Sequence, residues 1–425
     1  MKKQGWHLLL TVALTALMAL GAAGCKQAKT QSAPIKITYW HRMTGSYNTA
    51  LQHEIKAFNR SQSKYRVVGV SQGSYDALQE KIMAAAKSKT LPVMAQAPYT
   101  NIGDYVKAGF LTSFDANMLH GDAKLTAKQR ADLYPSFLST GKYQGKYYGL
   151  PFSVSTSVLF YNQTLMKKYG IAMPHTWADI EAAGKKVQAA KLAAVALDQS
   201  YDVTLEGMAQ QAGAKEITAS GKVNLGQPAV IDAAAKLLAL RKAGILTTAG
   251  SDGYFTTDFV NQKTLFAIGS SASIPVLEQQ APKSLAWGTA TIPAYAGHTG
   301  TPLNGNENVL FKTASKAQQR GAWLFSKFLM QGKQTAYWAA KTGYVPVAKS
   351  GTASATYQAY LKQHPAYQAA VDAVPASFGS TVFPGYTDYR NDLMDTVDST
   401  LTKHVSAKAA FTKLAKQTEQ IIAAQ

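Results

Sequence analysis

From residue 35 onward, short strand-like segments alternate with amphipathic helical segments. Residues 35–40 alternate apolar and polar side chains as a strand does, and the next apolar positions, Leu51, Ile55 and Phe58, follow at helical spacings of four and three. The same pattern predicts further strands and helices at 65–70, 75–87, 92–97 and 102–108. Strands separated by helices indicate an α/β fold with a mostly parallel sheet and right-handed crossovers.

The rest of the chain continues the α/β pattern without an internal repeat or a second linker. Glycines between Gly141 and Gly149 predict a hairpin, and a β-rich stretch follows at 155–161. Thr176 is a candidate N-cap for a helix that begins at Trp177. Further segments are predicted to be helical at 228–243, 321–330 and 392–425, and strand-like at 258–273. Two lobes in one continuous body fit this pattern better than a string of separate domains.

The first 34 residues have the pattern of an export signal followed by a tether. A basic start precedes an apolar run from about Leu8 to Leu20, which is shorter than the ~20 residues that a membrane-spanning helix needs. Small residues lead directly to Cys25, an arrangement similar to a bacterial lipobox, in which the cysteine is lipidated. We therefore expect residues 1–24 to be a lipoprotein signal peptide, residues 25–34 to be a flexible tether, and the protein to be exported and lipid-anchored to the outer face of the cell membrane. The alternative is an ordinary cysteine beside an ordinary cleavage site.

Composition and charge narrow the function classes. The chain of 425 residues, 46% of them hydrophobic, is long enough for about two domains with buried cores. Its formal net charge is +20, or +18 without Lys2 and Lys3 of the signal segment, but the basic residues are scattered. Because an exported protein meets no genome, we expect no nucleic-acid partner, and the charge favours anionic cell-wall polymers, anionic lipid or a diffuse surface bias. A single cysteine excludes an intrachain disulfide and a Cys-based metal site, and no cofactor or metal is expected.

Several short motifs together resemble one protein family. They are Trp40-His41-x-Met43-x-Gly45, Leu150-Pro151-Phe152 followed by Ser155-Thr156 and Phe160-Tyr161-Asn162, Thr176-Trp177, Lys341-Thr342-Gly343-Tyr344-Val345-Pro346, and the late Arg390. With these motifs the chain resembles the extracellular solute-binding proteins (family 1) of ABC importers, in particular the branch that binds sn-glycerol 3-phosphate and its diesters. The resemblance runs from Ile35 to near the C-terminus. It implies a bilobed periplasmic-binding-protein-like α/β fold, with a hinge and a ligand cleft between the lobes.

The resemblance also implies how the chain is divided and what it does. The first lobe is expected to comprise residues 35–148 and about 265–315, and the second lobe residues 149–264 and about 316–425. The protein is expected to be a monomer and not an enzyme. It is expected to capture glycerol 3-phosphate or a glycerophosphodiester outside the cell and to deliver this small polar solute to an ABC permease and its ATPase. An oligosaccharide or another carbohydrate is the alternative solute.

The ligand-binding positions of the family carry over to specific residues. The matches are Tyr75, Ser155, Ser270, Tyr344 and Arg390, the last two at the phosphate or near it. Gly305 and Asn306 stand at the Gly-Gly motif of the family, and Tyr99 stands where the family has a glutamate that accepts from glycerol hydroxyls. A pair of tryptophans expected near 199–202 is missing, with Tyr201 the nearby aromatic residue. These departures leave the expected architecture intact and the identity of the ligand open.

The chemistry of these residues suits an anionic ligand, but each has a simpler alternative role. Arg390 has a guanidinium fork suited to bidentate contact with phosphate oxygens, and its alternative is a surface ion pair with Asp388 or Asp392. The tyrosines and serines supply neutral hydroxyls, and their alternatives are half-buried packing and ordinary sheet positions. His41 is a candidate ligand contact, with a structural histidine beside Trp40 as the alternative.

Two other function classes explain less of the sequence. Ser139-Thr140-Gly141-Lys142, Ser251-Asp252-Gly253 and Lys341-Thr342-Gly343 follow the order of the three motifs of penicillin-interacting serine hydrolases. In those enzymes the first motif begins a helix, whereas the glycines around Lys142 predict a hairpin. A passive surface adhesin would need neither a hinge nor a polar cleft. A solute-binding protein therefore accounts for more of the motifs.

Overall fold

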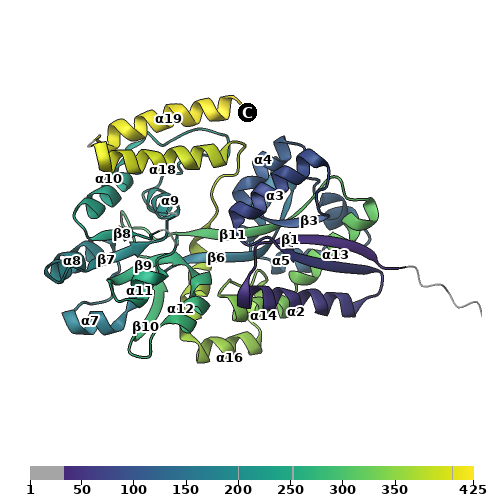
Figure 1. Cartoon of the computed structure of the whole chain (residues 1–425), viewed down its shortest axis with the longest axis horizontal. Helices are drawn as coiled ribbons and strands as arrows, with labels where there is room; N and C mark the ends of the chain where they lie inside the picture. Colours follow the sequence, from purple (N-terminus) through teal and green to yellow (C-terminus); the bar gives the residue numbers. More distant parts are fainter. Residues whose placement is uncertain (1–32, 200, 251–252, 404) are drawn as a thin grey trace, which may run out of the picture.

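The structure of the protein is a computed structural model that describes residues 33–199, 201–250, 253–403 and 405–425. The expected signal peptide, the lipidation site Cys25 and most of the tether lie outside the described residues. Figure 1 shows two lobes side by side, one built mainly from the purple and blue N-terminal part and the other from the teal part with the yellow C-terminal helices on top. The predicted α/β architecture is confirmed, because helices cover both halves of a large mixed sheet.

The first lobe contains a parallel sheet made of β2 (Tyr65–Ser71), β1 (Ile35–His41) and β3 (Met94–Pro98) in that order. Helix α2 (Gly45–Ser61) leads from β1 to β2, and α3 (Tyr75–Ser88) leads from β2 to β3. The apolar stripe of Leu51, Ile55 and Phe58 is the buried face of α2, as its spacing predicts. Helix α4 (Ile102–Lys107) follows β3.

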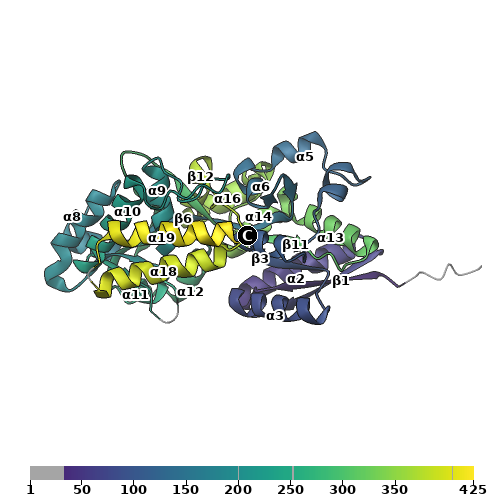
Figure 2. The ribbon, with the colours of Figure 1, turned by 90° about the horizontal axis from the view of Figure 1, so that it is seen from above.

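The second lobe contains a second parallel set, β9 (Thr264–Ser270), β7 (Ala193–Leu197) and β8 (Leu246–Thr248). Helix α8 (Trp177–Val187) packs on β7, and Thr176 caps it by accepting a hydrogen bond from the backbone N–H of Asp179, as predicted. Helices α9 (Tyr201–Gln211) and α10 (Pro228–Lys242) pack on each other. The last two helices, α18 (Tyr386–Lys403) and α19 (Ala407–Ala423), lie against α10, and Figure 2 shows them crossing this lobe.

Two long antiparallel strands, β6 (Gly149–Asn162) and β11 (Thr301–Leu310), connect the lobes. The first part of β6, up to Thr156, pairs with β11, whose other edge pairs with β3 of the first lobe. From Ser157 onward β6 pairs instead with β9 and with β10 (Trp287–Thr291) of the second lobe. One continuous strand therefore belongs to the sheets of both lobes.

The remaining elements are shorter or pack around this frame. They are α5 (Ala127–Asp132), α6 (Pro135–Thr140), β4 (Lys142–Tyr143), β5 (Lys146–Tyr147), α7 (Gln163–Tyr169), α11 (Thr256–Val260), α12 (Ile274–Gln280), α13 (Lys316–Leu329), α14 (Gly332–Thr342), α15 (Lys349–Thr352), α16 (Ala355–Gln363), α17 (Gln368–Asp372) and β12 (Ser377–Phe378). Between these elements lie the short 3₁₀ helices η1 (Tyr99–Asn101), η3 (Gln188–Ala190), η4 (Ser271–Ser273), η5 (Pro365–Tyr367) and η6 (Val374–Ala376), and the π-helical segment η2 (Ala116–His120). The predicted hairpin between Gly141 and Gly149 is the pair β4–β5.

The structure corrects two details of the sequence prediction. The stretch 258–273 is not one strand, because it contains the end of α11, then β9, then η4. The lobe boundaries also differ from those expected. Strands β9 and β10, expected in the first lobe within 265–315, pair with β6 and β7 of the second lobe. Helices α13 and α14, expected in the second lobe, pack on β1 and α2, and the buried Trp323 of α13 belongs to the same core cluster as Ile37.

Within the described ranges, no helix combines the length and the apolar character that crossing a membrane requires.

Candidate functional site

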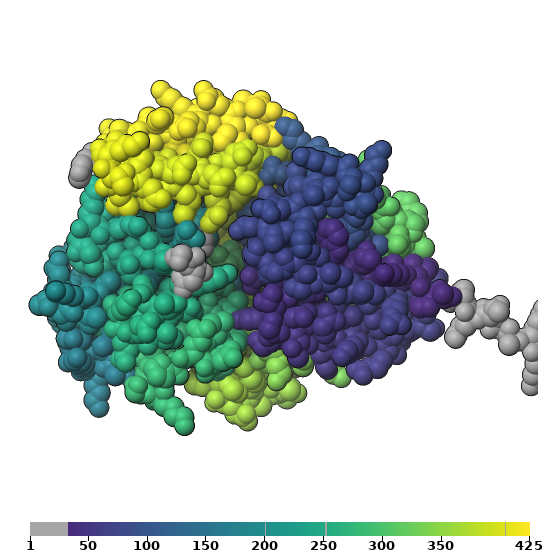
Figure 3. All heavy atoms as spheres, viewed as in Figure 1, coloured from purple at the N-terminus to yellow at the C-terminus, as the bar shows by residue number. Residues whose placement is uncertain are grey.

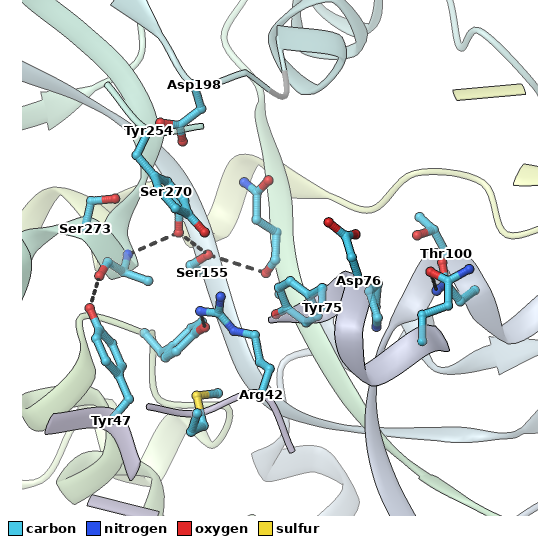
Figure 4. A pocket seen from close by; sticks show the side chains of 18 of the residues that line it. Arg42, Tyr47, Tyr75, Asp76, Thr100, Ser155, Asp198, Tyr254, Ser270 and Ser273 are labelled. Carbon is cyan, nitrogen blue, oxygen red and sulfur yellow. Dashed lines mark hydrogen bonds between the residues drawn. The ribbon is translucent and has the colours of Figure 1, made fainter. Parts of the chain in front are cut away.

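A cavity of about 590 Å³ lies between the lobes. Residues from α2, α3, β6, β11, η4 and α18 line it, so that both lobes and the connecting strands contribute. Figure 3 shows the molecule hollowed between the purple-blue and the teal-green halves, and Figure 4 shows side chains that line a pocket at close range. A cavity of this size with a partly polar lining is typical of a small-molecule site.

Both lobes direct the carboxyl ends of their parallel strands toward this cavity. The cavity-lining residues at or after these ends are Arg42 after β1, Tyr75 after β2, Thr100 after β3, Asp198 after β7 and Ser270 at the end of β9. Residues that follow a strand lie outside the hydrogen bonds of the sheet, so their side chains can face a ligand. Open α/β sheets therefore bind ligands at this edge.

Tyr75 forms part of the wall contributed by the first lobe. Ser74 caps α3 by accepting from the backbone N–H of Ala77, which makes Tyr75 the first helical residue. The Tyr75 hydroxyl accepts a hydrogen bond from Asn306 Nδ2 at 2.7 Å, and burial raises the pKa of this hydroxyl above its usual value. The hydroxyl is therefore neutral, and its own proton is not used in this bond. Asn306 itself is 1% exposed and orients Tyr75 from behind.

Arg42 extends into the same part of the cavity. Its Cζ lies 4.5 Å from the centroid of the Tyr75 ring, and its Nη2 donates to the Tyr344 hydroxyl at 3.4 Å. Figure 4 shows the guanidinium directed from the first lobe toward Ser155 in the middle of the cavity. Among the described residues, no carboxylate forms an ion pair with Arg42.

Ser155 and Ser270 meet where the two lobes join. Ser155 lies opposite Asn304 of β11, while Ser270 ends β9 opposite Ser157 of β6. Their Oγ atoms are 2.7 Å apart, although the residues are 115 positions apart in the chain. Ser270 Oγ also accepts from the backbone N–H of Ala272 at 3.1 Å. The pairing of three neighbouring strands thus brings two predicted ligand residues into contact.

Gly305 is required by the close approach of β11 to β6. Its φ is +127°, and a Cβ at this position would lie 1.9 Å from the carbonyl oxygen of Ser153. Glycine has no Cβ and adopts positive φ at little cost, so it fits where other residues do not. Gly305 and the adjacent Asn304 both line the cavity.

Tyr344 lines the cavity from the segment that follows α14. Gly343, with φ of +71°, ends that helix in the left-handed conformation and redirects the chain. The Tyr344 ring is stacked on Trp338, with 5.9 Å between ring centroids and 10° between planes. Because the side chain is only 3% exposed, its ring is fixed and its hydroxyl is the group available to the cavity and to Arg42.

Arg390 lines the cavity from α18, but its guanidinium already has an anionic partner. Its Nε and Nη2 donate to Oδ2 and Oδ1 of Asp202 at 2.7 and 3.0 Å. Asp202 belongs to α9 and its side chain is 7% exposed, so the pair joins two helices of the second lobe. The partner is neither Asp388 nor Asp392, the residues considered from the sequence. The fork expected to meet a phosphate is therefore engaged within the protein.

The sequence matches a family model described as bacterial extracellular solute-binding protein, over residues 54–366. The chain belongs to this family of solute-binding proteins. Among its similar curated relatives is the sn-glycerol-3-phosphate-binding periplasmic protein UgpB of Brucella melitensis, 26% identical over 360 residues that cover 80% of each chain. UgpB of Rhizobium meliloti is 23% identical over 369 residues, covering 83% of this chain and 84% of the relative.

Solved structures agree on the fold of this solute-binding protein. The cyclic alpha-maltosyl-1,6-maltose binding protein of Arthrobacter globiformis superposes with a TM-score of 0.81 at 20% identity, covering 92% of this chain and 100% of the other. UgpB from Mycobacterium tuberculosis in complex with glycerophosphocholine gives a TM-score of 0.79 at 21% identity, covering 93% and 99%. The predicted family and the periplasmic-binding-protein fold are confirmed. The protein is the solute-binding component of an ABC importer and not an enzyme.

Three residues expected to contact the ligand lie behind the cavity wall of this solute-binding protein: Asn306, which bonds to Tyr75, and also Tyr99 and His41. Tyr99 is 6% exposed, and its hydroxyl donates to the carbonyl oxygen of Leu303 and accepts from the backbone N–H of Ser380. His41 is fully buried beside Tyr39, and burial lowers its pKa to about 4. All three side chains have structural surroundings, and none is among the residues that line the cavity.

The cavity of this solute-binding protein also contains residues that the sequence reasoning did not select. They include Arg42, Tyr47, Tyr254 and Asn304. Arg42 occupies the variable position of the Trp40-His41-x-Met43 motif, so attention to the residue after a predicted strand would have found it. Tyr254 is 52% exposed, and no strand-end pattern marks it in the sequence.

Proposed function

We propose that this protein captures a phosphorylated glycerol, either glycerol 3-phosphate or a glycerophosphodiester. The observation that carries the proposal is convergence onto one cavity of residues that the resemblance selects from distant segments: Tyr75, Ser155, Ser270, Gly305, Tyr344 and Arg390. The similar relatives named sn-glycerol-3-phosphate-binding proteins support the same ligand class. Hydroxyls of Tyr75 and the two serines can bond to glycerol and phosphate oxygens, and guanidinium groups supply the positive field that a phosphate needs.

An oligosaccharide is the second candidate, and specific observations favour it too. Five tyrosines line the cavity: Tyr47, Tyr75, Tyr254, Tyr344 and Tyr386. Aromatic faces pack against sugar rings, and hydroxyls bond to sugar hydroxyls. A structural neighbour of this chain is a binding protein for a cyclic maltose derivative.

In the proposed mechanism the solute binds between the lobes, contacts both, and favours a closed form by its higher affinity for that form. The closed protein then delivers the solute to the permease and its ATPase. Export and lipidation at Cys25 would keep a monomeric protein at the outer face of the membrane, and residues 25–34 would give it freedom to turn.

Calorimetry tests the ligand class directly. The purified protein is titrated with glycerol 3-phosphate, glycerophosphocholine, glycerol and maltotriose. The proposal expects binding of at least one of the two phosphates and weaker or undetectable binding of glycerol and maltotriose. Binding of maltotriose with neither phosphate would overturn the ligand assignment and favour the second candidate.

A further inference from the structure

The two guanidinium groups that line the cavity are in different electrostatic states. Arg390 has both oxygens of Asp202 within 3.0 Å. Arg42 has one side-chain hydrogen bond, to the Tyr344 hydroxyl at 3.4 Å, and its Nε is buried with no hydrogen-bond partner among the described residues. Among the described residues, a phosphate that enters the cavity therefore meets one guanidinium that is paired with a carboxylate and one that is not.

The described residues around Arg42 orient its guanidinium but include no carboxylate paired with it. An arginine side chain stays protonated in proteins, so it cannot escape the cost of burial by losing its proton. The Tyr75 ring at 4.5 Å offers a cation–π contact, which restricts the guanidinium to one orientation and repays part of that cost. An unpaired donor in a partly buried site remains unfavourable until an acceptor reaches it.

The acceptor that fits this position is an anionic oxygen. Figure 4 shows the Arg42 guanidinium directed toward Ser155, which is hydrogen-bonded to Ser270. Tyr75, whose hydroxyl proton is not used in its bond to Asn306, stands beside it. An oxyanion placed here would meet charged N–H donors and neutral hydroxyls at once, a combination that gives short and strong hydrogen bonds.

We infer that Arg42, and not Arg390, makes the charged contact with the phosphate of the solute. Arg390 instead holds α18 against α9 through Asp202 and so shapes the wall of the cavity. This inference rests on the proposed function, because it requires a phosphate-bearing ligand. It assigns charge recognition to a residue outside the set that the family resemblance selected.

Calorimetry on matched variants tests the assignment, with glycerol 3-phosphate and glycerophosphocholine as ligands. Arg42→Gln keeps a polar side chain but removes the charge, and it should weaken binding of the phosphates at least ~30-fold, the lower end for truncating a buried charged partner. Arg42→Lys should recover part of that loss, because an ammonium keeps the charge but not the fork. The double variant Asp202→Asn with Arg390→Gln removes both charges of the other pair and should weaken binding less than Arg42→Gln does.

Arg320→Gln is the control for net charge. Arg320 lies on α13 and pairs with the exposed Asp122 outside the cavity, so its loss changes the total charge as Arg42→Gln does. Its binding should equal that of wild type. Thermal unfolding of each variant checks that the fold is retained.

The outcomes separate this inference from the proposed function. If wild type binds a phosphate and Arg42→Gln binds it equally well, or if the Asp202/Arg390 double variant loses as much as Arg42→Gln, the assignment to Arg42 is wrong while the proposed function stands. If folded wild type binds neither phosphate, both are wrong. A large loss confined to Arg42→Gln, with partial rescue by lysine, supports both.

Discussion

Glu307 is a buried carboxyl group in one of the strands that connect the lobes. It is 1% exposed, and its Oε2 has no hydrogen-bond partner among the described residues. Thr140 Oγ1 lies 2.6 Å from both Glu307 Oε1 and the carbonyl oxygen of Phe137. Thr140 has one hydroxyl proton and can donate to one of them, so a protonated Glu307 that donates to Thr140 satisfies both contacts. Burial raises the pKa of Glu307 to about 8.

Because of this carboxyl group, we expect the free energy of unfolding to decrease as pH rises. The pKa is higher in the folded protein than the ~4.3 of an unfolded chain, so the folded state binds the proton more tightly. The stabilisation from this proton is complete below about pH 4 and is lost as pH rises to about 8. Glu307→Gln should remove this part of the pH dependence. Between about pH 5 and about pH 9, the variant should therefore lose less free energy of unfolding than wild type does, by on the order of 2–4 kcal/mol.

Urea unfolding at several pH values measures this difference. Glu80→Gln removes a carboxyl group exposed on α3 and should follow the wild-type curve. A Glu307→Gln curve parallel to that of wild type would show that Glu307 is ionised in the folded protein.

At the scale of single residues, the sequence predicted which residues line the cavity more reliably than it predicted their hydrogen-bond and ion-pair partners. Tyr75, Ser155, Ser270, Gly305 and Tyr344 were selected from motifs, and all of them line the cavity. The partner of Arg390 is Asp202, 188 residues away, and only the packing of α18 near α9 brings the two together. Tyr99 was assigned by its place in the family pattern, but its hydroxyl is used by Leu303 and Ser380. A motif fixes a location in the fold, whereas the neighbours depend on how distant elements pack.

At the scale of elements, amphipathic periodicity was sufficient to locate helices and strands that have one buried face. It located β1, α2, β2 and α3 to within a few residues, because their apolar positions repeat with the period of a helix or a strand. Strand β11 gave no such signal. Its middle, Asn304 to Asn308, is polar. Some of these residues line the cavity, and others are buried in hydrogen bonds. Asn308, for example, accepts a hydrogen bond from the Tyr39 hydroxyl. A functional strand can thus be hidden by the polar residues that its function requires.

The need for glycine at position 305 of β11 can be tested by substitution. Gly305→Ala should destabilise the protein by more than ~2 kcal/mol, because the added Cβ would lie 1.9 Å from the Ser153 carbonyl oxygen and the backbone has positive φ. Gly297→Ala is the matched control: its φ is +80°, but a Cβ there has no heavy atom within 4 Å. This control should show only the ~1–2 kcal/mol of left-handed strain. Equal destabilisation of both variants in urea would mean that β6 and β11 can separate at little cost.

At the scale of the whole molecule, the proposed anchor is tested at Cys25. If the thiol carries the lipid, Cys25→Ser should move the protein from the membrane fraction to the medium, because the substituted residue cannot be lipidated on sulfur. Fractionation of cells followed by immunoblotting measures the distribution. Equal membrane retention of the variant would remove the lipoprotein proposal without affecting the solute-binding role.

Closure around the solute is the property that would make this protein useful to an importer. The lobes are connected by β6 and β11, and the cavity is lined from both sides, so a ligand that contacts Tyr75 on one side and Ser270 on the other gains contacts when the lobes approach. A ligand shifts the balance between open and closed forms only by its difference in affinity for them, so a solute that bridges both lobes should favour the closed form.

Small-angle X-ray scattering with a saturating phosphorylated ligand should therefore show a smaller radius of gyration than without ligand, at a mass that corresponds to a monomer. Glycerol at the same concentration is the control, because it offers Arg42 no anion and should leave the radius unchanged. If calorimetry demonstrates binding and the radius still does not change, the lobes behave as one rigid body. The importer would then have to recognise the bound solute itself, since the shape of the protein would carry no signal that the cavity is filled.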